Sequence, residues 1–229
     1  MDPALFNNLP NSISQARLEP YLNACSGDLK QALRLYTWNI EASASLWGEL
    51  HVLEISLRNT IHDRMIQQFG KADWWTDKKV KLTYPQKIML KAAVKNANES
   101  ATRKKRTTVP EDVVANSVFA FWTAFLGPAG LLQFETLYWQ PFLKYAFPNF
   151  TGSRKDLFND FDHVRLLRNR IAHHEPICMR FLIGDHNRIL RVVGYINDDI
   201  AQYIKSHSRI MESLDRRDSA VIHGTGTRF

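Results

Sequence analysis

The stretch LWGELHVLEISLRNTIHDRM, residues 46–65, decides the fold class. Its apolar side chains recur three or four positions apart, which is the spacing of one face of an α-helix. These apolar positions are Leu46, Leu50, Leu53, Leu57, Ile61 and Met65. No stretch of the chain shows a convincing alternation of apolar and polar residues, which is the pattern of a β-strand. We therefore predict an all-α protein.

Further helices are expected on both sides of this stretch. Asp28 is a plausible N-cap, Gly70 a stop signal and Pro110 a helix start, and Ser153 is expected to cap a long helix. Outside that long helix, the expected ranges are 12–25, 28–42, 45–69, 85–101, 110–125, 134–145, 187–206 and 208–216. Residues 101–108 are predicted to form a loop. Many helices with short connections are typical of a helical bundle.

Composition excludes several classes of protein. With 229 residues, 45% of them hydrophobic, and six tryptophans, the chain can fold around a core and is not disordered. The opening MDPALFNN lacks the basic and apolar regions of a secretory signal. The most apolar passage, residues 118–132, is too short to span a bilayer. The two cysteines form no metal or disulfide pattern. We expect a cytoplasmic protein without membrane association.

Positive charge is concentrated in residues 78–106. This segment holds ten Lys or Arg residues and one acid, Glu99, so its formal charge is about +9. The net charge of the whole chain is +7, so the remaining residues are slightly acidic. Such a segment favours a polyphosphate partner. The alternative is a solvated helix followed by a loop. Candidate nucleic-acid contacts are Arg103, Lys104, Lys105 and Arg106.

A second stretch, LRNRIAHHEP at residues 167–176, combines apolar and titratable side chains. On a helical wheel, Arg168 falls in the middle of an apolar stripe. An unpaired buried charge is prohibitive, so Arg168 must reach solvent, pair with a carboxylate or serve a function. The apolar residues of this stripe are Leu157, Phe161, Val164, Ile171 and Ala172.

Polar residues on another flank of the same helix form a candidate site. Asn169 and His173 are four residues apart and can touch, while His174 points elsewhere. Pro176 is expected to end the helix at or near Glu175, which places both histidines in its last turn. A purely structural interpretation stays open, in which Arg168 pairs with an acid of another helix and the histidines cap helical carbonyls.

The helix predicted at residues 45–69 offers partners for this site. One flank of it carries His51, Glu54, Arg58 and His62. Glu54 could meet Arg168 and hold it in place. The alternative is a surface pair of Glu54 with Arg58, worth only a few tenths of a kcal/mol.

The string LRNRIAHHEPI, residues 167–177, resembles the signature of the Abi-like proteins of bacterial abortive infection, a branch of the HEPN superfamily of helical ribonucleases. That signature is an arginine, usually followed by a polar residue, and a histidine after four to six intervening positions. Arg168, Asn169 and His173 match it. The stretches LEISLRNTI, FAFWTAFL and PFLKYAFP are similar to the same family, and the likeness covers roughly residues 47–203.

The resemblance implies a HEPN-like helical core at residues 45–207, with an N-terminal helical extension at 1–44 and a C-terminal helix and frayed tail at 208–229. It also implies a metal-independent endoribonuclease that acts as a homodimer, with two copies of the motif in one composite site. Catalytic roles then fall to Arg168, Asn169 and His173, and supporting roles to Glu54, Arg58 and His174. Expected partners are an RNA substrate and an antitoxin or small RNA, and no cofactor is expected.

The residues suit cleavage of RNA by its own 2′-hydroxyl, in a phage-defence or toxin–antitoxin setting. A histidine that titrates near neutrality suits a base or an acid, and an arginine holds a phosphate by a bidentate fork. The sequence offers no convincing metal site and no phosphate-binding glycine loop. A competing hypothesis is a non-catalytic helical module of a defence system that binds RNA or another protein.

Overall fold

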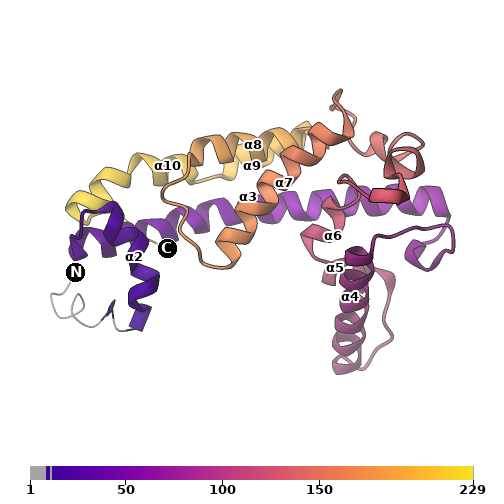
Figure 1. Ribbon diagram of the computed structural model, residues 1–229, viewed down its shortest axis with the longest axis horizontal. Coiled ribbons are helices and arrows are strands. Elements are labelled where there is room, and N and C mark those ends of the chain that lie inside the picture. Colours follow the sequence, from indigo (N-terminus) through magenta and orange to yellow (C-terminus); the bar gives the residue numbers. More distant parts are fainter. Residues whose placement is uncertain (1–8, 11, 229) are drawn as a thin grey trace. The chain divides into compact units, whose positions relative to one another are not determined.

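The computed structural model describes residues 9–10 and 12–228, and the regular secondary structure of this part is all helical, without a β-strand (Figure 1). The all-α prediction is therefore confirmed. The α-helices are α2 (Gln15–Ala24), α3 (Leu29–Phe69), α4 (Tyr84–Arg103), α5 (Pro110–Asn116), α6 (Phe119–Thr123), α7 (Arg154–Ala172), α8 (Leu182–Gly194), α9 (Asp198–His207) and α10 (Ile210–Asp215). Short 3₁₀ or π turns occur at Trp74–Thr76, Gly130–Leu132, Glu135–Trp139, Leu143–Ala146 and Ser219–His223. None of the helices in the described part is both long and apolar enough to cross a membrane.

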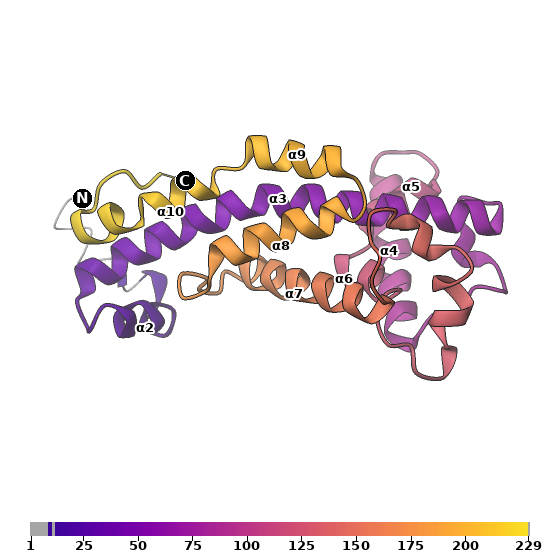
Figure 2. The ribbon, with the colours of Figure 1, turned by 90° about the horizontal axis from the view of Figure 1, so that it is seen from above.

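Helix α3 is one uninterrupted helix of 41 residues (Figure 2), so the prediction of two helices at residues 28–42 and 45–69 was wrong. The serines between them do not break the helix. The hydroxyl of Ser45 donates a hydrogen bond to the carbonyl of Glu41 at 3.0 Å, and this bond satisfies the hydroxyl without disturbing the backbone ladder. The apolar face also continues through, because Ala42 and Leu46 are fully buried. The predicted N-terminal boundary at residue 44 falls inside this helix.

Other predicted helices are shorter or divided. The helix predicted at 110–125 breaks between α5 and α6, where Ser117 is extended and accepts a hydrogen bond from the Trp122 indole at 2.7 Å. The helix predicted at 187–206 starts earlier and breaks between α8 and α9. There the Asn197 side chain accepts the Asp199 amide at 2.7 Å and starts a new helix. At 134–145 only short turns form, and the loop predicted from residue 101 begins after Arg103.

The chain forms two compact units, and α3, α7, α8 and α9 each contribute to both. Within the described residues, the first unit comprises 9–10, 12–51, 166–189 and 204–228. The second comprises Val52–Arg165 and Leu190–Tyr203.

The first unit packs α2, the first part of α3 and α10 together. The rings of Tyr21 and Tyr36 meet edge to face at 5.3 Å between centroids. The indole of Trp38 donates a hydrogen bond to the carbonyl of Ser213 at 2.8 Å. Buried Glu41 forms an ion pair with Arg216 at 2.5 Å and accepts the amide of Arg228 at 3.2 Å. Polar groups on buried faces of α3 therefore fasten the C-terminal segment.

The second unit has an aromatic core. Its largest rings are fully or almost fully buried and meet mostly edge to face, an arrangement that aromatic pairs prefer. They are Trp74, Phe121, Trp122, Phe125, Phe134 and Tyr138. The Tyr138 hydroxyl donates to the carbonyl of Lys81 and accepts its amide, both at 2.7 Å. These two hydrogen bonds fix the segment that leads into α4.

Candidate functional site

Helix α7 carries the predicted motif at its C-terminal end and is fixed at its N-terminal end by a capping box. The Ser153 hydroxyl donates to the Asp156 carboxylate at 2.6 Å and accepts the Asp156 amide at 3.2 Å. The Ser153 amide also donates to that carboxylate. These hydrogen bonds lower the pKa of Asp156. They satisfy donors that a helix start leaves unpaired, and they confirm the prediction that Ser153 caps this helix.

Arg168 falls within the angular range of the buried stripe of α7 and is itself half-buried. Its guanidinium stacks over the ring of Trp47, with the central carbon 5.5 Å from the ring centroid. Trp47 is 41% exposed, so this cation–π pair stays open to solvent on one side. The charge predicted to interrupt the apolar stripe is therefore accommodated on an aromatic face. The buried residues of the stripe are Leu157, Phe161, Val164, Leu167 and Ile171.

Helix α7 ends at Ala172, three residues earlier than predicted, and both histidines lie just beyond it. His174 has a φ of 57°, in the left-handed region. Its amide donates to the carbonyl of Ile171 at 3.0 Å, and the Glu175 amide donates to the carbonyl of Arg170 at 2.8 Å. These two bonds form a Schellman motif, in which His174 occupies the position that glycine usually takes. The left-handed residue, rather than Pro176, ends the helix.

Side chains hold this turn in place. Arg170 donates to the carbonyl of Pro176 at 3.0 Å and lies 3.5 Å from the carboxylate of Glu175. Arg17 of α2 donates to the carbonyl of His174. Further along, the Asn39 side chain accepts the amides of Ile177 and Cys178 at 2.8 and 3.0 Å. The turn is therefore braced from α2 and α3 within the first unit.

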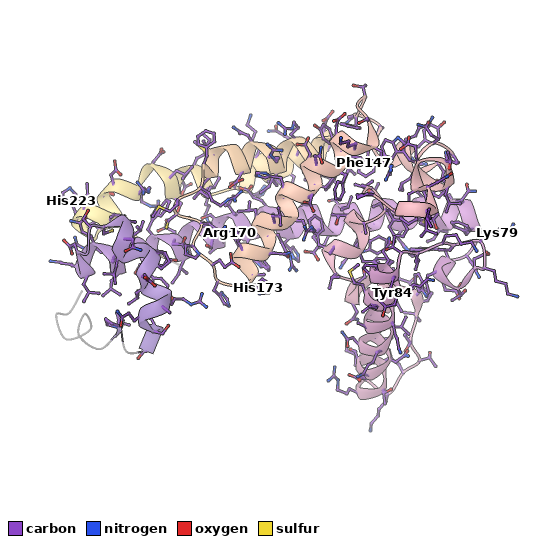
Figure 3. All side chains as sticks on the ribbon, viewed as in Figure 1. Lys79, Tyr84, Phe147, Arg170, His173 and His223 are labelled. Atoms are coloured by element: carbon purple, nitrogen blue, oxygen red, sulfur yellow. The ribbon has the colours of Figure 1, made fainter. Side chains whose placement is uncertain are left out.

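The turn presents His173 to solvent. Figure 3 shows His173 at the end of α7, close to Arg170, and the residue is exposed. The His173 amide still donates to the carbonyl of Asn169 at 2.9 Å, so these two residues keep helical spacing and share a flank. Arg168 lies five positions before His173, which corresponds to about 140° around the helix axis. One chain therefore places Asn169 and His173 together and turns Arg168 toward another side.

The residues predicted to support the site have different surroundings. His62 is buried, and its Nδ1 accepts a hydrogen bond from the Trp74 indole at 2.9 Å. It is a core residue and not part of a polar flank. Arg58 is half-buried, and its Nε has no hydrogen-bond partner among the described residues. Glu54 and Arg58 belong to the second unit, and the pairing of Glu54 with Arg168 stays a prediction.

The four basic residues predicted to contact nucleic acid are not equivalent. Arg106 forms a bidentate ion pair with Asp112, at 2.6 Å for both bonds. This contact raises the pKa of Arg106 and lowers that of Asp112. Because the carboxylate of Asp112 occupies this guanidinium, Arg106 does not offer it to a phosphate. Arg103, Lys104 and Lys105 are exposed at the end of α4, so the candidate surface keeps three of its four cations.

A buried polar cluster in the first unit escaped the sequence reasoning. The Nδ1 of His186 lies 2.9 and 3.0 Å from the two carboxylate oxygens of Glu49, and the Ser208 hydroxyl donates to the same carboxylate. Glu49 and His186 are 3% and 6% exposed, so this pair is almost closed to solvent, while Ser208 is half-buried. No sequence signal could have found it, because its members come from three distant segments. Nowhere in the described part of the chain, this cluster included, does a group of three His, Cys, Asp or Glu residues lie so as to hold a metal ion.

Comparisons with known proteins do not identify the chain. No family model, curated protein or solved structure matches it.

Proposed function

We propose that this protein is a metal-independent endoribonuclease with a HEPN-like site, made of Arg168, Asn169 and His173. The observation that carries the proposal is the Schellman turn at the end of α7. It holds an imidazole in solvent on the flank of Asn169, and the guanidinium stacked on Trp47 lies five residues earlier in the chain. The resemblance of residues 167–177 to Abi-like proteins adds a setting in bacterial phage defence or in a toxin–antitoxin pair.

The proposed reaction uses the RNA itself as nucleophile. His173 takes the proton of a 2′-hydroxyl, and the 2′-oxygen forms a bond to the adjacent phosphorus. The bond from phosphorus to the 5′-oxygen breaks, and an acid protonates the leaving oxygen. Arg168 holds the phosphate, and it stabilises the charge that develops on the phosphorane. The products are a 2′,3′-cyclic phosphate and a 5′-hydroxyl end.

A second chain completes the site in this proposal. One histidine cannot serve as base and acid in the same step, and Arg168 and His173 diverge by about 140° on one helix. Large apolar side chains are also exposed in the same unit and flank the motif in sequence. These are Leu166, Met179 and Phe181, at 50%, 59% and 77% exposure. Exposed apolar residues of this size are typical of an association surface. We therefore propose a homodimer in which His173 of the partner subunit supplies the acid.

The test is cleavage of end-labelled RNA in EDTA by the wild-type protein and by Arg168→Ala, Asn169→Ala and His173→Ala. We expect a loss of at least a hundredfold for His173→Ala, because general acid–base catalysis contributes roughly 10²–10⁴-fold. His223→Ala and Arg209→Ala are matched controls, since both residues are exposed in the first unit and far from the motif in sequence. Circular dichroism checks that each variant is folded.

The outcomes separate the two functional hypotheses. Undiminished cleavage by Arg168→Ala and His173→Ala would remove this site assignment. A requirement for a divalent metal would contradict the mechanism. RNA binding without cleavage of any RNA would favour the non-catalytic module instead.

A further inference from the structure

A pocket of about 360 Å³ lies beside the first half of α4, in the second unit. Its volume is within the range of roughly 300–1,000 Å³ that is usual for ligand sites. It is lined by Trp75, Val80, Leu82, Lys87, Leu90, Lys91 and Val94. Neither the motif on α7 nor the basic residues 103–106 contribute to it.

The walls of the pocket are apolar, and its aromatic ring is held firmly. Trp75 is half-buried, and its ring meets that of buried Trp74 edge to face at 5.4 Å. Trp75, Leu90 and Val94 pack together on the small buried cluster that joins α4 to α5. An indole fixed in this way offers a flat apolar surface at low entropic cost.

The rim of the pocket is positively charged. Lys87 and Lys91 are both exposed and lie one turn apart on α4, about 6 Å along its axis. No carboxylate is among the residues that line the pocket. The pocket opens within the segment of residues 78–106, which carries ten cations and one acid. The charge of the site therefore favours an anionic ligand.

A second aromatic residue stands next to the lysines. Tyr84 begins α4 and is 77% exposed (Figure 3). It precedes Lys87 by three positions, so the two residues lie on neighbouring parts of the same helix surface. Two aromatic rings, those of Trp75 and Tyr84, and two cations thus occur within residues 75–91.

We propose that this pocket binds one nucleotide of single-stranded RNA, with the base against Trp75 and the flanking phosphates on Lys87 and Lys91. The inference rests on the proposed function, in which RNA is the substrate. A nucleotide in a single strand has a flat base and a phosphate on each side of its sugar. The base fits an apolar pocket with an aromatic wall, and the two phosphates fit the two lysines on its rim. Single strands are bound in this way, by stacking on aromatic side chains inside a positively charged groove. A duplex hides the faces of its bases, so we expect it to bind worse.

The experiment measures binding of a fluorescent single-stranded RNA by anisotropy, in EDTA, with the full chain carrying His173→Ala to prevent cleavage. Trp75→Leu keeps an apolar side chain but removes the flat ring, and we expect roughly tenfold weaker binding. The double variant Lys87→Ala/Lys91→Ala loses two phosphate contacts. When the log of the association constant is plotted against the log of the salt concentration, we expect the slope to become shallower by about 1.4, or roughly 0.7 per contact.

Matched controls lie in the same unit, away from the pocket. Lys155→Ala removes an exposed cation, and Tyr145→Ala removes a side chain that is 55% exposed. Both are expected to bind RNA within twofold of the parent. Trp75→Phe serves as a second variant if Trp75→Leu fails to fold, and it is expected to weaken binding less, because a ring remains.

The results distinguish the pocket from the catalytic proposal. If the wild-type protein cleaves RNA but the pocket variants bind RNA as well as the controls do, the pocket is not an RNA-binding site. The proposed function is then unaffected. Weakened binding by the pocket variants would support the pocket even if the wild type cleaves nothing. Polyglutamate, anionic vesicles or duplex RNA that compete as well as single-stranded RNA would overturn the assigned occupant. Absence of any RNA binding by the parent would overturn the pocket as an RNA site.

Discussion

At the residue scale, the turn that presents His173 depends on an unusual conformation of its neighbour. His174 holds φ at 57°, a region that side chains with a Cβ atom rarely adopt. Arg17 donates to the carbonyl of this residue and so stabilises the turn from α2. The structure thus gives His174 a backbone role, whereas the sequence analysis assigned it only a supporting role at the site.

Replacement of His174 by glycine tests that role. Glycine adopts the left-handed region without a steric penalty but loses more entropy on folding, so we expect a change in the free energy of unfolding of less than about 1 kcal/mol. A β-branched valine is expected to lower that free energy by about 1–2 kcal/mol. Urea denaturation measures both variants. RNA cleavage by His174→Gly at the wild-type rate would confine His174 to this structural role.

His62 makes the stability of the second unit depend on pH. Burial lowers the pKa of His62, and the nearby carboxylates of Asp63 and Glu111 oppose this shift only in part. Below about pH 6.5 the unfolded chain binds a proton at this residue before the folded chain does. The unfolded state then holds more protons, so the free energy of unfolding falls as the pH falls.

A neutral acceptor at position 62 is expected to remove this dependence. In His62→Asn the amide oxygen can still accept the Trp74 indole, but the residue no longer titrates. Urea denaturation between pH 7.5 and 5.5 is expected to show a shallower loss of stability in the variant, by up to about 1.4 kcal/mol per pH unit for one proton. Parallel pH profiles for the two proteins would show that His62 does not titrate differently on folding.

At the scale of the element, the capping box of α7 stabilises the helix that carries the motif. Ser153→Ala removes the hydroxyl that accepts the Asp156 amide, and we expect a loss of about 1 kcal/mol in the free energy of unfolding. Ser153→Asp keeps a hydrogen-bond acceptor for that amide, so we expect a much smaller loss in the free energy of unfolding. Thermal and urea denaturation compare the two variants. Equal losses in both would mean that the capping hydrogen bond contributes nothing.

At the scale of the whole molecule, the proposed homodimer predicts that an inactive subunit also inactivates its partner. We expect wild-type protein that is unfolded and refolded with an equal amount of His173→Ala to keep about a quarter of the RNA cleavage of the same total amount of wild type. Random pairing makes about a quarter of the dimers fully wild-type, and each mixed dimer lacks one of the two histidines that the reaction needs. A mixture of wild type with His223→Ala is the control and is expected to keep full activity. A His173→Ala mixture that keeps half of the activity would contradict a site that uses one histidine from each chain.

The exposed apolar residues around the motif predict how the dimer is broken. We expect the double variant Met179→Glu/Phe181→Glu to sediment more as a monomer at micromolar concentration, because it places charges on the proposed association surface. We also expect it to cleave less RNA. Ile222→Glu is the matched control, because Ile222 is 56% exposed in the same unit. A wild-type protein that is monomeric at that concentration would remove the composite site altogether.

The sequence by itself determined the helical class, the apolar faces of its helices and the cap of α7. These features follow from local periodicity and from side-chain hydrogen bonds over three or four residues, which a sequence displays directly. Local rules failed where a break was expected between the helices predicted at 28–42 and 45–69, and where His62 was assigned to a polar flank. In both places the outcome depends on what the side chain meets.

Only the tertiary structure decided the surroundings of the candidate site. The stacking of Arg168 on Trp47 and the support of the turn by Arg17 and Asn39 join residues more than a hundred positions apart. The pairing of Glu49 with His186 spans 137 positions. Such contacts depend on how the helices pack and not on local spacing. For that reason the motif was visible in the sequence, whereas the stacking of Arg168 on Trp47 and the pocket beside Trp75 were not.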